Sequence, residues 1–184
     1  MTEQTDTLPA PLLPAVELRV PTHEDAFVWH RLFDDPEVME FFGGSSAELS
    51  MYEELTARQR RHDAERGYCL WTVLDEGGTP IGFAGAQPWP RDWGPTGEIE
   101  IGWRFARTAW GKGYASAAAR ATVERLRAAG VPSVVAMVDA GNERSIAVTR
   151  RLGMERAETF TTPPRIPGDD GSRRVAHCFR LVLR

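Results

Sequence analysis

The sequence predicts one domain with a mixed α/β sandwich, in which helices cover a sheet. Strand-like and helix-like segments alternate in the order β-α-α-β-β-β-α-β-α-β-β along the 184 residues. The turn sequence Glu76-Gly-Gly-Thr-Pro80 between two apolar runs is typical of a hairpin. A pair of glycines then opens an alanine-rich helix in the middle of the chain. A chain of this length is expected to bury the core of one domain.

The N-terminal half begins with a polar, Pro-rich stretch at 1–14, which is expected to be a flexible tail, with the domain at 15–184. The segments expected next are a strand at 15–20, a helix from 22 to about 33, a helix from 46 to about 65, and strands at 68–74 and 81–87. Thr22 and Asp25 make a start like a capping box for the first helix. Asp34-Asp-Pro36 ends it.

The C-terminal half continues the alternation. The expected segments are a strand at 98–105, a helix at about 113–129, a strand at 133–139, a helix at 142–152, and strands at 155–161 and 175–183. Gly130 and Pro132 end the longer helix, and Gly153 closes the shorter one. Loops are expected at 88–97 and 162–174.

Composition excludes several classes of protein. Hydrophobic content of 42% and charged content of 26% are ordinary for a globular protein. A net charge of −4 argues against nucleic acid as a partner. No apolar run is long enough to span a membrane, and the polar start is unlike a signal peptide. Cys69 and Cys178 are expected to be buried, reduced thiols, and no metal-ligand spacing occurs, so we expect a cytoplasmic protein without a metal.

The run Trp110-Gly-Lys-Gly-Tyr-Ala115 is the most informative stretch of the chain. It stands between the strand at 98–105 and the start of a helix, where backbone N–H groups lack intrahelical partners and the helix dipole is positive. The glycines allow a phosphate to approach these groups closely. Lys112 is the only lysine among the 22 basic residues. The run therefore predicts a site for a phosphorylated cofactor.

Three phosphate-binding motifs compete for this run. A Walker loop fails because Lys112 is followed by Gly113, not by Ser or Thr. A Rossmann fingerprint fails because Ser116 takes the third glycine position. The run instead resembles the pyrophosphate loop of the GNAT superfamily of acyl-CoA-dependent N-acyltransferases, with Trp110 in the usual Gln or Arg position. Two further segments, Glu100-Ile-Gly-Trp103 and Asn142-Glu-Arg-Ser145 with the following Arg-Leu-Gly-Met154, are similar to the ribosomal-protein N-terminal (alanine/serine) acetyltransferase branch.

This resemblance implies a fold and a cofactor. The fold would have a central, mostly antiparallel sheet of about seven strands with helices on both faces. The acyl donor would be acetyl-CoA or another acyl-CoA, with no metal. The expected cofactor-binding residues are Trp103, Arg104, Phe105, Trp110, Gly111, Lys112, Gly113, Tyr114, Ala115 and Asn142. The resemblance also makes Ser145 a candidate for protonating the leaving thiolate, although a serine near a helix start often bonds back to the helix.

A base for the amine is expected on the strand at 98–105. Strand geometry places Glu98, Glu100, Gly102 and Arg104 on one face. Two carboxylates on one face of a covered strand either line a cleft or pair with cations, and Arg104 is a ready partner. Both Glu100 and Glu98 stay candidates. Spacing supports no Ser-His-Asp or Cys-His nucleophile, which favours direct attack by the amine.

The leading hypothesis is an N-acetyltransferase acting on a primary amine, and the alternative is a CoA-binding sensor or regulatory module without chemistry. The acceptor could be a protein N-terminus or a small-molecule amine. It is expected against the early helices and the loops at 41–46, 88–97 and 162–174, where acidic residues could attract a cation. These residues are Asp34, Asp35, Glu37, Asp169 and Asp170. No nucleic acid or membrane is expected as a partner, and the chain could be a monomer or a homodimer.

Overall fold

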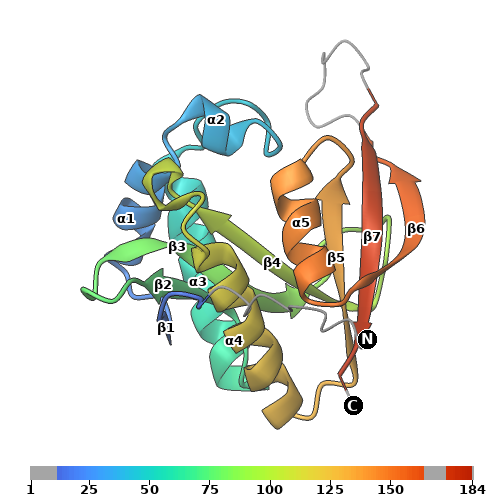
Figure 1. The fold of residues 1–184 in the computed structure, drawn as a ribbon. Helices are drawn as coiled ribbons and strands as arrows, with labels where there is room; N and C mark the ends of the chain where they lie inside the picture. Colours follow the sequence, from blue (N-terminus) through green and yellow to red (C-terminus); the bar gives the residue numbers. More distant parts are fainter. Residues whose placement is uncertain (1–11, 164–172, 184) are drawn as a thin grey trace, which may run out of the picture.

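A computed structural model describes residues 12–163 and 173–183. Its centre is a seven-stranded sheet in the order β1-β2-β3-β4-β5-β7-β6 (Figure 1). The strands are β1 (Glu17–Arg19), β2 (Leu70–Leu74), β3 (Pro80–Pro88), β4 (Ile99–Phe105), β5 (Ser133–Asp139), β6 (Glu155–Thr161) and β7 (Val175–Val182). Neighbouring strands are antiparallel except β4 and β5, which are parallel.

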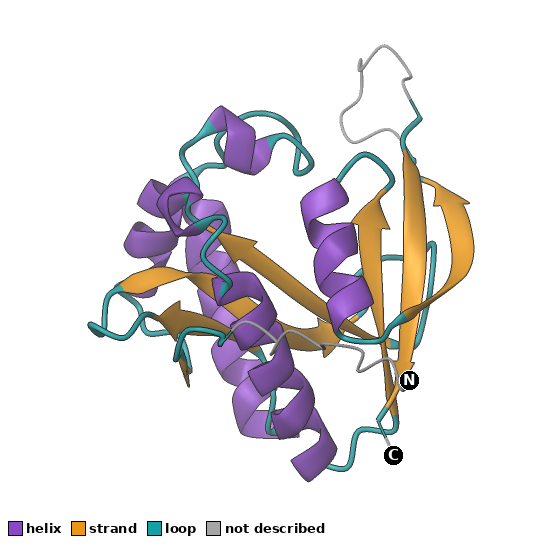
Figure 2. Ribbon diagram, in the orientation of Figure 1, coloured by secondary structure: helices purple, strands orange, loops and turns teal. Residues whose placement is uncertain are grey.

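Helices cover both faces of this sheet (Figure 2). On one face lie α1 (Asp25–Leu32), α2 (Pro36–Met39) and α3 (Leu49–Arg66), and on the other lie α4 (Tyr114–Ala128) and α5 (Glu143–Arg151). Each face has its own apolar core. Trp29 of α1 and Phe33, the residue that follows α1, pack on Phe83 of β3, whereas Ala118 and Leu126 of α4 belong to a core with Ile101 of β4. The expected fold class is confirmed.

The two parallel strands at the centre of the sheet separate. β4 pairs with β3 along its whole length, but it meets β5 at a single bridge between Glu100 and Val135. Beyond this bridge the carboxyl-terminal ends of β4 and β5 diverge (Figure 1). The second half of β4 therefore lacks a strand partner on its β5 side.

Local sequence signals explain most of the observed boundaries. The Thr22 N–H donates to Asp25 Oδ2 at 2.7 Å, which holds the start of α1. Gly67 ends α3 in the left-handed conformation that favours glycine. β5 and β6 have the expected bounds. The sequence analysis did not predict α2, although Pro36 suits a first helical position and Asp35 caps the helix by accepting from the Glu37 N–H at 2.9 Å.

Several expectations fall at the limits of the described chain. Residues 1–11 of the expected tail and 164–172 of the expected loop, with Asp169 and Asp170, lie outside the described residues. Cys69 and Cys178 are free and buried. Within 12–163 and 173–183, no helix is long and apolar enough to cross a membrane, and no group of His, Cys, Asp or Glu residues could hold a metal ion.

Candidate active site

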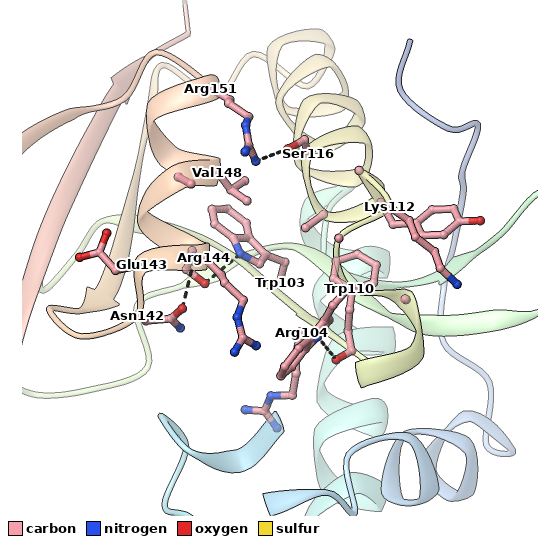
Figure 3. Close-up of a pocket in the computed structure, with 18 of the residues that line it drawn as sticks. Trp103, Arg104, Trp110, Lys112, Ser116, Asn142, Glu143, Arg144, Val148 and Arg151 are labelled. Carbon is pink, nitrogen blue, oxygen red and sulfur yellow. Dashed lines mark hydrogen bonds between the residues drawn. The ribbon is translucent and has the colours of Figure 1, made fainter. Parts of the chain in front are cut away.

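A cavity of about 910 Å³ opens where β4 and β5 separate (Figure 3). Its walls come from the second half of β4, the start of α4, the start of α5 and the loop after α2. The lining residues include every one of the ten expected cofactor-binding residues, together with Ser145. Segments that are far apart in the sequence thus meet at one site.

The start of α4 forms one wall of this cavity. Gly111 and Gly113 have φ angles of +73° and +87°, in the left-handed region that L side chains rarely adopt. A Cβ built on Gly111 would meet no heavy atom within 4 Å. The first N–H groups of α4 follow directly, so this wall presents unpaired donors and the positive end of a helix dipole.

Gly113 faces a different neighbour. A Cβ there would lie 3.0 Å from Cδ of Pro14 and 3.4 Å from Cδ2 of Leu13. The end of the expected tail thus packs on the cofactor loop. A side chain at Gly113 would first meet this segment, so Gly111 is the better position for probing the cavity.

Trp110 fixes the glycine loop before α4, residues 110–113, to the end of β4. Its indole Nε1–H donates to the Phe105 carbonyl oxygen at 3.0 Å (Figure 3). The guanidinium of Arg144, on α5, lies 3.9 Å from the centre of a Trp110 ring. Such a cation–π contact connects α5 to the loop across the cavity. The tryptophan therefore has a structural role in the position where the family motif usually has Gln or Arg.

Four basic side chains line the cavity near the start of α4, and three of them were not among the cofactor-binding residues expected from the sequence. Lys112, Arg120, Arg144 and Arg151 all line the cavity. Arg151 Nη1 donates to the hydroxyl of Ser116 at 3.3 Å, which connects α5 to α4 (Figure 3). Arg144 and Arg151 belong to the two motif segments quoted for the resemblance, so their positions carried a signal. Positive charge around helix N–H groups suits a phosphorylated ligand.

Asn142 and Ser145 lie together at the start of α5. The Asn142 side chain caps the helix, because its Oδ1 accepts from the Ser145 N–H at 3.1 Å. Within the described part of the chain, the Ser145 hydroxyl makes no hydrogen bond back to the helix. Its Oγ accepts from the indole Nε1–H of Trp103 at 3.3 Å, across the gap between β4 and α5 (Figure 3). With one lone pair engaged, this hydroxyl keeps its own proton to donate.

Glu98 is engaged in an ion pair. Arg180 of β7 binds both of its carboxylate oxygens, and the Nη2–Oε1 distance is 2.8 Å. Of the two alternatives for these carboxylates, pairing with a cation applies to Glu98, and the cation is Arg180 of β7, not the ready partner Arg104. Neither Glu98 nor Glu100 lines the cavity.

Glu100 is half-buried, and its carboxyl group is desolvated. Burial raises the pKa of its carboxyl to about 7, whereas a hydrogen bond from Gln87 and the positive charge of Arg91 act in the opposite direction. Gln87 is its partner across the β3–β4 ladder. A carboxyl group that titrates near neutral pH is suited to accept a proton from an amine.

Gly102 leaves space beside Glu100. It lies between Glu100 and Arg104 on the same face of β4, and a Cβ there would meet no heavy atom within 4 Å. The backbone at this glycine is not in the left-handed region, so its conformation would also allow a residue with a side chain. The open position at Gly102 therefore lies two residues from Glu100, on the same face of the strand.

Arg104 points to the face opposite the cofactor loop, toward the blue N-terminal helices (Figure 3). Its guanidinium lies 3.8 Å from the ring centre of Phe42 and 5.3 Å from that of Phe33, and Nη1 lies 3.9 Å from Sδ of Met39. Phe41 and Phe42, from the loop at 41–46 that is expected to bind the acceptor, line the cavity. No residue of the loop at 88–97 is part of this lining, and Trp89 and Trp93 of that loop pack on each other.

Comparison with known proteins agrees with this geometry. The family model for the acetyltransferase (GNAT) domain matches residues 15–155. YkkB of Bacillus subtilis is 33% identical over 141 residues, which cover 74% of this chain and 79% of that protein. An L-methionine sulfoximine/L-methionine sulfone acetyltransferase of Pseudomonas aeruginosa is 34% identical over 104 residues, which cover 55% of this chain and 60% of that enzyme.

Solved structures show the same fold. The structure of YncA from Salmonella typhimurium with its cofactor acetyl-CoA matches with a TM-score of 0.69 at 17% identity, covering 92% of this chain and 95% of that one. A ribosomal-protein-alanine N-acetyltransferase from Brucella melitensis also matches with a TM-score of 0.69, at 19% identity, covering 91% and 99%. Such low identity shows the fold alone, so the resemblance to the ribosomal-protein branch stays a prediction. The family match over most of the chain is sufficient for one conclusion: the protein belongs to the GNAT family of acetyltransferases.

Proposed function

We propose that this protein transfers the acetyl group of acetyl-CoA to a primary amine by direct attack in a ternary complex. One observation carries the proposal. The lining of the cavity between β4 and β5 includes the glycine loop before α4 and also Phe41, Phe42 and Arg104, which we expect to face the acceptor. A donor held by the loop and an amine arriving from the α2 side would therefore meet beside β4.

The loop and the basic side chains would hold the phosphates of the donor. The N–H groups after Gly111 and the positive end of α4 supply most of this interaction. Lys112, Arg120, Arg144 and Arg151 add charge at the rim. Acetyl-CoA supplies a thioester whose carbonyl carbon the amine nitrogen attacks, after which the carbon–sulfur bond breaks and the amide remains.

Glu100 is the base in this proposal. Because neither Glu100 nor Gly102 lines the cavity, the proton would have to pass from the cavity along β4 past the open position at Gly102, directly or through a water molecule. Glu98 is a poorer candidate than Glu100, because its carboxylate already binds Arg180. Ser145 would give its hydroxyl proton to the leaving sulfur, while Trp103 holds its oxygen.

The acceptor defines the next experiment. An amine panel should contain peptides with alanine and serine N-termini, polyamines and amino acids. L-methionine sulfoximine should be included, because the relative from Pseudomonas aeruginosa is named as an acetyltransferase of this compound. Mass spectrometry of the products would show which amine gains an acetyl group.

A binding measurement separates this function from the alternatives. Acetyl-CoA should raise the melting temperature, whereas ATP and NAD should not. A sensor module would be stabilised by acetyl-CoA but would acetylate no amine. Stabilisation by ATP or NAD in place of acetyl-CoA would overturn the proposal.

A further inference from the structure

Two glutamine side chains are buried between α3 and the sheet, on the same side as Glu100. Gln59 of α3 is 0% exposed and Gln87 of β3 is 9% exposed. A buried amide is costly unless its hydrogen bonds are made, and an apolar side chain would fill the same space without that cost. Their presence at this interface needs an explanation.

The hydrogen bonds of these amides run in one direction. The backbone N–H of Leu70 can only donate, and it donates to Gln59 Oε1 at 2.9 Å. This leaves the Gln59 Nε2 group to donate to Gln87 Oε1, at 2.8 Å. With its oxygen engaged, Gln87 presents its own NH₂ group to the carboxyl of Glu100, its partner across the ladder. A backbone donor in β2 thus sets the orientation of two amides in turn.

We propose that Gln59 and Gln87 are positioning residues for Glu100, aiming an amide donor at its carboxylate and so favouring the form that accepts a proton. The inference rests on the proposed role of Glu100 as base. Gln87 touches the carboxyl, and Gln59 acts through Gln87. Without Gln59, the amide of Gln87 is free to turn its oxygen toward Glu100, and an oxygen cannot donate to a carboxylate.

The other groups around Glu100 also act on its pKa or are neutral. Burial raises its pKa, and Gln87 and then Arg91, from the loop before β4, lower it. Cys178 of β7 is buried and its thiol is kept protonated, because burial raises its pKa to about 11. Glu98 is neutralised by Arg180. The amide of Gln87 is therefore the largest of the influences that favour the ionised carboxyl.

The test compares Gln59→Met with Thr56→Val. Thr56 is buried one turn earlier on the same helix, but its hydroxyl donates to the Glu53 carbonyl oxygen of its own helix. Both changes remove a buried polar group, and only the first breaks the chain of amides. NMR titration of the ¹³C-labelled Glu100 carboxyl gives its pKa without any need for turnover.

In the Gln59→Met protein, the pKa of Glu100 is expected to rise by about one unit, the effect of losing one hydrogen bond to a charged group. The acid limb of kcat/KM should move by the same amount, giving about tenfold less activity at pH 6, while KM for acetyl-CoA stays unchanged. Thr56→Val should leave both titrations as in the wild type.

An unchanged Glu100 titration in Gln59→Met would overturn the inference. If that variant does not fold, Gln87→Met is measured in its place, with the same expected rise and the same contrary result. If the wild type acetylates no amine, the proposed function fails, but the NMR titration still decides whether the two glutamines act on Glu100.

Discussion

At the scale of single residues, the desolvated carboxyl of the half-buried Glu100 makes folding less favourable at high pH. Its pKa is about 7 in the folded protein and ordinarily 4.5. Below pH 4.5 both states are protonated. Between pH 4.5 and 7 the unfolded chain releases the proton first, so stability falls as pH rises and stays lower above pH 7.

Glu100→Gln should remove this effect. The variant is expected to be more stable than the wild type at pH 8, by about 3 kcal/mol at most, and to gain nothing at pH 4. Urea unfolding at the two pH values measures the difference. Glu98→Gln is the control, since it loses the ion pair with Arg180 and should not stabilise the protein. Equal gains at both pH values would contradict the burial of the Glu100 charge.

Ser145 and Trp103 are joined by a hydrogen bond, and each can be changed separately. Ser145→Ala should lower kcat by about 10²-fold, the contribution of one general acid, and leave the affinity for acetyl-CoA unchanged. Trp103→Phe keeps the ring but loses the N–H that bonds to Ser145, so a smaller loss of kcat is expected. Steady-state kinetics and calorimetry separate the two constants. A Ser145→Ala protein with normal turnover but weakened binding would leave the serine with a structural role only.

At the scale of elements, the start of α4 decides whether the cavity holds a phosphorylated ligand. Gly111→Val should abolish detectable binding of CoA in calorimetry, because Gly111 lines the cavity and a side chain there would occupy open space. Gly78→Val is a matched control. Gly78 has a φ of +77°, close to the +73° of Gly111, and equally open surroundings, but it lies in the β2–β3 turn.

Both variants carry similar backbone strain, so both should lose similar stability. Only the Gly111→Val protein should lose its affinity for CoA. Equal affinities in the two proteins would show that the phosphates lie elsewhere.

The middle of β4 gives a prediction about the acceptor. Gly102→Val fits its extended backbone and the empty space, so the fold should be retained. The new side chain fills the region beside Glu100, and KM for the amine is expected to rise or kcat to fall at least tenfold, with acetyl-CoA affinity intact. Wild-type kinetics toward the amine would mean that neither the amine nor its proton passes this glycine.

At the scale of the whole molecule, the sequence predicts elements well where a local signal marks them. Hairpin turns, glycine ends and alternation place β2 to β7 within a few residues. The missed helix α2 has only four residues, too few for an apolar period to be visible. The cavity needed tertiary information, since the separation of β4 from β5 is a property of the sheet.

The same distinction holds within the site. The glycine loop is local, and its residues all line the cavity as expected. Period-two alternation placed Glu98 and Glu100 on one face but could not tell them apart. Their difference depends on Arg180, which is 82 residues from Glu98, and on Gln87 in the adjacent strand. Pairing partners at such distances in the chain leave no local pattern.

The pH dependence of acetyl transfer is the most direct test of Glu100 as the base. The measurement is kcat/KM for one amine acceptor from pH 5.5 to 9.5, in the wild type and in Glu100→Gln. We expect the wild-type value to rise through about pH 7, as the carboxyl ionises. The variant should lack this limb, bind acetyl-CoA normally and recover part of its activity only at high pH, where the amine loses its proton unaided. Full activity of Glu100→Gln across the whole range would contradict the central claim that Glu100 takes the proton.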